Sequence, residues 1–99
     1  MHHRSIVLTF ASMYRPTYNA PKARDLLSYV VGELGPAATP QRVVTTLFYV
    51  DLTNYRDAGS SVTGATYQAA AHGPDSRDLQ STMREMMDAG ELAFAECAS

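Results

Sequence analysis

Asp51 and His72 are the two residues of this chain whose types and surroundings suggest chemistry. Asp51 lies four residues from both Leu47 and Tyr55, so in a helix its carboxylate falls on an apolar face. An ionised carboxylate buried on such a face is costly unless hydrogen bonds or a cation satisfy it. We therefore expect Asp51 to accept backbone N–H bonds from the linker over residues 64–74, or to pair with an arginine. A role as a general base is the less favoured alternative.

His72 precedes a Gly-Pro pair, and a lone histidine in a turn usually serves as a hydrogen-bonding turn residue. A metal-binding histidine would need further ligands at an interpretable spacing, and the sequence offers none. Asp51 and His72 form a conceivable hydrolase pair, but no nucleophile or oxyanion donor accompanies them. The glycines form no phosphate-binding pattern. We therefore expect no catalytic residue, no metal site and no cofactor, in a protein that is not an enzyme.

Composition limits the classes of partner. The 99 residues fit a single domain over residues 1–99. Eight basic against ten acidic residues give a net charge of −2, whereas nucleic-acid binders usually show a basic face. No apolar run reaches the roughly 20 residues that span a bilayer, and the single cysteine, Cys97, fits a reducing compartment. These features favour a cytoplasmic protein that binds a protein, with nucleic acid unlikely and no membrane.

The elements that must position Asp51 and His72 start with an N-terminal strand and loop over residues 1–20. Residues 5–10 are β-branched and aromatic enough to predict the strand. One face of this strand carries Ile6, Leu8 and Phe10. Asn19 then predicts the N-cap of a first helix, with Pro21 in its first turn and Gly35 at its end.

The second helix carries Asp51. Thr39 predicts its N-cap and Pro40 its first position, and the helix is expected to stop before Gly59. Its apolar face is broad enough for the central helix of the core. That face comprises Val43, Val44, Leu47, Phe48, Val50, Leu52 and Tyr55.

The third helix follows the linker. Asp75 or Ser76 is expected to cap it, Asp78 places an acid in its first turn, and Gly90 ends it. A stripe at helical spacing predicts its buried face. The stripe comprises Leu79, Met83, Met86 and Met87.

Strands are predicted around these helices. Residues 62–70 favour an extended or short strand segment, and Gly73-Pro74 favours a turn. Residues 91–96 alternate between apolar and small side chains, as in a final strand. The expected fold is therefore α+β and mostly helical, with three main helices and a small antiparallel sheet from the two chain ends.

This order of elements is also similar to a winged helix. A DNA-reading third helix would need basic residues on its outer face. The predicted helix offers Arg77 and Arg84 among several acids, so a winged-helix transcription regulator is the weaker alternative.

Three stretches resemble the Panacea domain of SocA-type antitoxins. They are T-P-Q-R-V-V-T-T-L-F-Y-V-D-L over residues 39–52, followed by Gly59; T-G-A-T-Y-Q-A-A-A-H-G-P over residues 63–74; and L-x-x-x-M-x-x-M-M-D-A-G-E-L over residues 79–92. That family shows a helix ending in a Leu-Tyr-x-x-Asp-like run, a Gly-x-x-Tyr to Gly-Pro segment, and a helix closed by glycine and an aliphatic residue. The resemblance covers about residues 24–96 and implies a shortened, divergent member of the family.

The resemblance implies a toxin-neutralising protein of bacteria, phages and other mobile elements, which in some members delivers the toxin to a protease. The signature positions it assigns are Tyr49, Asp51, Gly64, Tyr67, Gly73 and Pro74.

We therefore expect an antitoxin-like, non-catalytic protein-binding module of a toxin–antitoxin system. A phage-encoded inhibitor of a bacterial defence complex, similar in role to an anti-CRISPR protein, is the nearest alternative. The partner is expected to contact the outward side chains of the second and third helices. The candidates are Thr45, Tyr49, Arg56, Arg77, Arg84 and Met87.

Overall fold

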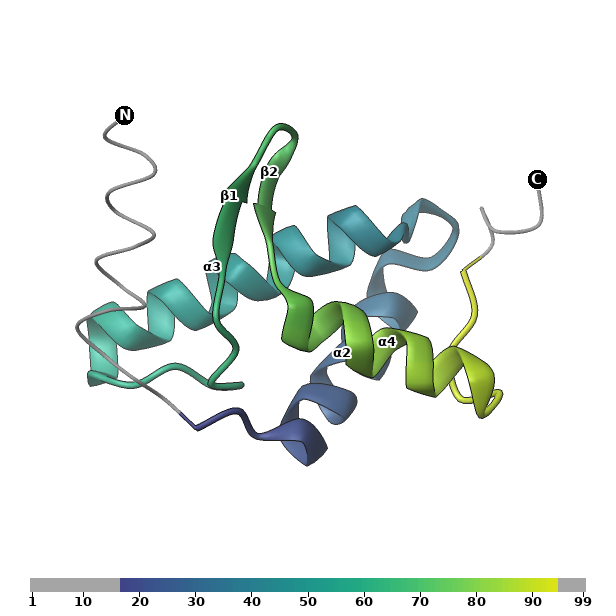
Figure 1. Cartoon of the computed structure of the whole chain (residues 1–99), viewed down its shortest axis with the longest axis horizontal. Helices are drawn as coiled ribbons and strands as arrows, with labels where there is room; N and C mark the ends of the chain where they lie inside the picture. The colour runs from purple at the N-terminus through teal and green to yellow at the C-terminus, as the bar shows by residue number, and fades with distance from the viewer. Residues whose placement is uncertain (1–16, 95–99) are drawn as a thin grey trace.

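The computed structural model of this chain describes residues 17–94. Over this range the chain forms three α-helices, one short 3-10 helix and a two-stranded hairpin, which confirms the predicted mostly helical α+β fold (Figure 1). The strand expected at residues 5–10 lies outside the described residues.

The first helix, α2 (Ala20–Leu34), begins and ends where its local signals predict. The Asn19 side chain accepts a hydrogen bond from the backbone N–H of Lys22 at 3.0 Å, and Pro21 occupies the first turn. Gly35, with φ of 56°, closes the helix and starts the 3-10 helix η1 (Gly35–Ala37). Both predicted ends are confirmed, because caps are decided by residues that are neighbours in sequence.

The second helix, α3 (Pro40–Ala58), is the longest element and contacts α2, α4 and the hairpin. The Thr39 hydroxyl accepts from the backbone N–H of Arg42 at 3.2 Å. Gly59 takes the left-handed conformation that ends many helices, and its N–H donates to the Tyr55 carbonyl at 2.8 Å. The N-cap and stop predicted for this helix are confirmed.

The sheet is a hairpin inside the chain, so the predicted sheet from the two chain ends is wrong for the described C-terminal part. Strand β1 (Gln68–Ala70) pairs antiparallel with β2 (Gly73–Asp75), with Ala69 opposite Pro74. Of the segment expected over residues 62–70, only these three residues form a strand. Gly73-Pro74, predicted as a turn, belongs to β2. Proline is tolerated there because each strand of a two-stranded sheet is an edge.

The third helix, α4 (Arg77–Asp88), resolves the choice between two capping residues. The Ser76 hydroxyl accepts from the backbone N–H of Leu79 at 3.3 Å. At the other end, Gly90 donates to the Met87 carbonyl and Glu91 to the Met86 carbonyl, with Gly90 at φ of 76°. This paired closure at glycine is a Schellman motif and confirms the predicted stop.

Residues 91–94 form no strand, which corrects the predicted final strand over its described part. Leu92 and Phe94 are buried while Glu91 and Ala93 are exposed. The alternation in sequence therefore reports alternating burial over the core and not pairing with a second strand. A wing after the last helix is absent from this part of the chain.

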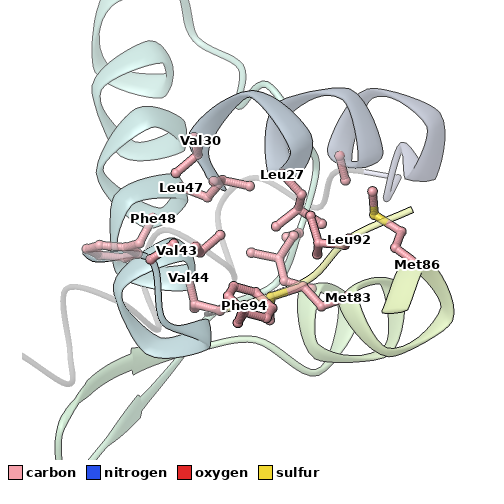
Figure 2. Close-up of a cluster of buried hydrophobic side chains, with 14 of the residues drawn as sticks. Leu27, Val30, Val43, Val44, Leu47, Phe48, Met83, Met86, Leu92 and Phe94 are labelled. Atoms are coloured by element: carbon pink, nitrogen blue, oxygen red, sulfur yellow. The ribbon is translucent and has the colours of Figure 1, made fainter. Parts of the chain in front are cut away.

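The core lies between the three helices, and Figure 2 shows its side chains converging from α2, α3, α4 and the segment after α4. Most of the predicted apolar stripes are buried in it. Leu52 and Tyr55 are half-buried and pack against the core, whereas Val50 is half-buried outside the core cluster and Met87 is 37% exposed. The buried apolar residues are Ala23, Leu27, Val30, Ala38, Val43, Val44, Leu47, Phe48, Ala65, Tyr67, Leu79, Met83, Met86, Leu92 and Phe94. Among residues 17–94, no helix has the length and apolar character needed to cross a membrane.

Candidate functional site

Asp51 is fully buried on the inner side of α3, and its carboxylate accepts four hydrogen bonds. Its Oδ1 atom accepts from the backbone N–H groups of Val62 and Thr63 at 2.8 and 2.9 Å. Its Oδ2 atom accepts from the Thr63 hydroxyl at 2.6 Å and from the Tyr67 hydroxyl at 2.7 Å. Four donors satisfy both oxygens of a buried carboxylate, which offsets the cost of its desolvation.

Asp51 is a buried acceptor, as predicted, but its backbone donors do not come from the predicted residues 64–74. The backbone donors are Val62 and Thr63, which come directly before the expected stretch of residues 64–74, and Tyr67 lies within that stretch. The alternative, an arginine partner, is not found among these four donors. The arrangement joins α3 to the segment after it and leaves the carboxylate without solvent exposure.

Tyr67 is the second buried member of this group. Burial, and after it the negative charge of Asp51, raises the pKa of the Tyr67 hydroxyl above its usual range. Its ring packs edge-on against Phe48, with 5.1 Å between the ring centroids. Tyr67 is therefore a neutral hydrogen-bond donor, whose hydroxyl is held by Asp51 and whose ring is held by Phe48.

Gly64 fixes how closely the linker approaches the start of the described chain. Its φ is +75°, and a Cβ atom added there would overlap the backbone carbonyl of Thr17. The backbone N–H of Asn19 donates to the Thr63 carbonyl at 2.7 Å across the same contact. Glycine is required at this position for both its conformation and its size.

His72 does not join Asp51. His72 is exposed in the turn between β1 and β2, whereas Asp51 has no exposed surface. The backbone carbonyl of His72 accepts a hydrogen bond from the Gln41 side chain at 2.6 Å, which ties the hairpin to α3. Within residues 17–94, no group of three or more His, Cys, Asp or Glu side chains is arranged to hold a metal ion. The pairing of Asp51 with His72 that a hydrolase would need is not formed.

The six signature positions that the resemblance to the Panacea domain assigns lie at three different places in the fold. Asp51, Gly64 and Tyr67 belong to the buried junction between α3 and the linker, and Gly73 and Pro74 to strand β2. Tyr49 lies apart from both, with 59% of its surface exposed. Two positions along a helix are about 200° apart, so Tyr49 points outward where Asp51 points inward.

The outward side of α3 carries two hollows. The first, which we call the Tyr49 hollow, has a volume of about 560 Å³. It is lined by Thr46, Tyr49, Val50, Thr53, Asn54, Asp57 and Val62. The second has a volume of about 470 Å³ and lies toward the N-terminal end of α3. It is lined by Leu34, Thr39, Gln41, Arg42, Thr45 and Thr46.

The candidate partner-binding residues fall on two helices. Thr45 and Tyr49 line the two hollows of α3, and Arg56 is exposed on the same helix. On α4, Arg77 and Arg84 are exposed and Met87 is partly exposed. Neither hollow includes a residue of α4, so the structure gathers the α3 candidates around hollows and leaves the α4 candidates elsewhere.

Sequence reasoning missed much of the Tyr49 hollow. Four of its lining residues follow one another at helical spacing and form one stripe: Thr46, Val50, Thr53 and Asp57. Because only one of the four is apolar, the sequence pattern does not distinguish this stripe from a solvated helix face. Val50 was expected in the core. Val62 also lines the hollow, and its backbone N–H donates to Asp51, a contact that no local pattern encodes.

Comparison of the chain with protein-family models, with curated proteins and with solved structures finds no match.

Proposed function

We propose that this chain is a non-catalytic protein-binding module that neutralises a partner protein, as an antitoxin does, in the cytoplasm of a bacterium. The observation that carries the proposal is the Tyr49 hollow, where an exposed aromatic side chain borders a concave and partly apolar surface. Aromatic side chains beside such surfaces are typical anchors of protein–protein interfaces.

Tyr49 is positioned before any partner arrives. Its ring makes an edge contact with the buried ring of Phe48, with 5.2 Å between the centroids and an interplanar angle of 72°. A side chain restrained in this way loses less conformational entropy on binding than a free one. Tyr49 therefore suits the centre of a contact surface, with Thr45 and Arg56 farther along the same helix.

The buried environment of Asp51 supports a function without catalysis. A general base must come within hydrogen-bond reach of a substrate proton. The Asp51 carboxylate has no exposed surface, and its four acceptor contacts are occupied by protein groups. The hydrogen bonds that the Asp51 carboxylate accepts stabilise the fold.

The resemblance to the Panacea domain supports an antitoxin among the protein-binding classes. Three of the residues that carry it, Asp51, Gly64 and Tyr67, meet at one buried junction. The signature residues on this reading define a scaffold, and the outward side of α3 is free to suit a particular partner. A toxin–antitoxin system of a phage or other mobile element is the proposed setting.

Affinity capture from the native host tests the proposal. The wild-type chain and the Tyr29→Ala variant are expected to retain the same partner, and Tyr49→Ala is expected to lose it. Tyr29 is a matched control because it is an exposed tyrosine, 64% accessible, on the helix α2. The captured partner is then co-expressed with the chain, and relief of its toxicity is measured.

Capture of no protein, together with turnover of a small molecule, would refute the proposal. A partner that is a component of a defence complex and not a toxin would instead favour the phage-encoded inhibitor. The winged-helix alternative predicts a gel shift on upstream DNA that weakens steeply with salt.

A further inference from the structure

The two hollows on the outward side of α3 form one continuous surface, because Thr46 lines both of them. Along this surface, side chains at helical spacing form a stripe on the side of the helix opposite its buried residues. The stripe comprises Arg42, Thr46, Tyr49, Val50, Thr53 and Asp57. From its first to its last residue it extends for about 22 Å, at the rise of an α-helix.

The stripe carries one charge of each sign, at opposite ends. Arg42 lies in the first turn of α3 and Asp57 in the last turn, and both residues are exposed. Neither side chain forms an ion pair within residues 17–94. The helix dipole favours acids at the N-terminal end and bases at the C-terminal end, so each charge lies at the end that disfavours it. An opposite charge on another molecule would stabilise each of them.

The stripe is nearly symmetric about its own midpoint. The midpoint between Arg42 and Asp57 falls between Tyr49 and Val50, and the two threonines of the stripe lie equally far from it on either side. A second copy of α3, antiparallel to the first and related to it by a two-fold axis at this midpoint, therefore places each Arg42 opposite the Asp57 of the other copy. The threonines then face one another, and Tyr49 and Val50 meet across the axis. A surface that complements itself in this way is the kind that two-fold homodimers use.

The centre of the stripe is suited to contact with another helix. Tyr49 is 59% exposed, and its ring is restrained by the edge contact with Phe48. Val50 is half-buried outside the core cluster, so part of its aliphatic surface remains available. Thr46 and Thr53 are small enough for two helices to approach to the usual interaxial distance of about 8–10 Å. An apolar centre with charged ends is the usual arrangement of a protein–protein interface.

We propose that two copies of this chain associate through the outward sides of α3, as antiparallel helices that pair Arg42 of each copy with Asp57 of the other. The surface is small beside a standard protein interface, so a weak dimer with a micromolar or higher dissociation constant is expected. The dimer does not depend on what the protein neutralises. Where the proposed function also holds, the second copy and the neutralised protein compete for Tyr49.

Sedimentation velocity of the full chain, from micromolar to millimolar concentration, tests the dimer. The wild-type chain is expected to shift from a monomer of 10.8 kDa towards twice that mass. Arg42→Asp and Asp57→Arg each place like charges opposite one another at both ends of the dimer, and each is expected to raise the dissociation constant at least about tenfold. Both substitutions put a charge at the helix end that the dipole favours, so both variants are expected to stay folded.

Charge exchange separates antiparallel pairing from a general effect of net charge. An equal mixture of the Arg42→Asp and Asp57→Arg chains is expected to associate as the wild type does, because one chain then has acids at both ends of the stripe and the other has bases. The double variant, which only exchanges the two charges, is expected to associate as well. Arg84→Asp and Asp88→Arg, at exposed positions of α4, change the net charge by the same amounts and are the matched controls. Both are expected to leave association unchanged.

A wild-type chain that stays monomeric at millimolar concentration overturns the proposal. Association of either single α3 variant to the wild-type extent overturns it as well, and so does a mixture of the two that remains monomeric. Loss of association in the α4 controls would assign the effect to net charge and would also overturn the pairing. Circular dichroism verifies that each variant is folded. No other protein is used in these measurements, so their failure is distinct from a failure of the proposed neutralising function.

Discussion

The Asp51 carboxylate joins four donors, from three residues of the following segment, to the inside of α3. A buried acceptor of this kind stabilises the fold mainly because its removal would leave several buried donors without partners. Asp51 and Tyr67 are therefore the residues at which single-atom changes are expected to have the clearest effect on stability.

Asp51→Asn is expected to lower the free energy of unfolding by about 1–3 kcal/mol, because an amide nitrogen cannot accept the bonds that a carboxylate oxygen accepts. Urea unfolding monitored by circular dichroism measures the change. Asp57→Asn, at an exposed acid on the same helix, is the matched control and should stay within about 0.5 kcal/mol of the wild type. Equal effects of the two substitutions would contradict a special role for Asp51.

Alkaline pH is expected to destabilise the protein through Tyr67. The folded state raises the pKa of this hydroxyl, so its neutral form is retained while the unfolded chain ionises. The stabilisation is fully present below about pH 10 and is lost as the pH rises above it, by up to about 1.4 kcal/mol per pH unit. Urea unfolding between neutral pH and pH 11 measures this slope.

Tyr67→Phe removes the ionisable group and should flatten the alkaline slope. Burial also raises the pKa of Tyr18, so part of the slope is expected to remain in this variant and to disappear when Tyr18→Phe is added. An unchanged slope in Tyr67→Phe would show that the buried hydroxyl is not responsible.

At the scale of the elements, contacts between loops and neighbouring segments hold the loops in place. The junction at Gly64 brings the loop after α3 against the start of the described chain, and the Gln41 side chain holds the hairpin turn at His72. These contacts join the loops to three helices that also pack directly against one another.

Gly64→Ala is expected to destabilise the protein by about 2–4 kcal/mol, since a Cβ atom would meet both a strained backbone and the Thr17 carbonyl. Gly59→Ala isolates the conformational part, because Gly59 also has a positive φ but open space around it. That control should cost about 1 kcal/mol. Thermal unfolding of both variants measures the difference, and equal losses would argue against the close approach.

Ser76→Ala is expected to cost about 1–2 kcal/mol, because it removes the N-cap of α4 at a fully buried position. Ser81→Ala, an exposed change within the same helix, should be neutral or slightly stabilising, since alanine favours helices. Chemical denaturation compares the pair. A loss in Ser81→Ala as large as that in Ser76→Ala would assign the effect to composition and not to capping.

At the scale of the whole molecule, the buried junction and the proposed partner-binding surface lie on opposite sides of α3. Asp51 lies inside and Tyr49 outside, and no described hydrogen bond joins them. On this arrangement the core and the junction can keep the fold while the outer side of the helix adapts to a partner.

Tyr49→Ala is therefore expected to remove partner binding and to leave the free energy of unfolding within about 0.5 kcal/mol of the wild type. Asp51→Asn should do the reverse, with lower stability and an unchanged Kd at temperatures where the variant is folded. Calorimetric titration with the captured partner and urea unfolding measure the two properties. Loss of both properties in Tyr49→Ala would contradict the separation.

The sequence by itself determined the helices and the side on which each is buried. Asn19, Thr39 and Gly59 act on backbone groups a few residues away, so their effects can be read locally, and the predicted boundaries are confirmed. Helical spacing likewise placed Asp51 on the buried face and predicted its need for hydrogen-bond donors, although the backbone donors lie just before the predicted linker.

Only the tertiary structure decided which distant segments meet. Alternation over residues 91–94 shows burial but cannot distinguish a strand from a coil that covers a core, and the strand pairing falls instead within residues 68–75. Val50 and Val62 form the Tyr49 hollow because Asp51 draws the loop back onto α3. Such contacts depend on the packing of the whole chain, and local periodicity in the sequence does not predict them.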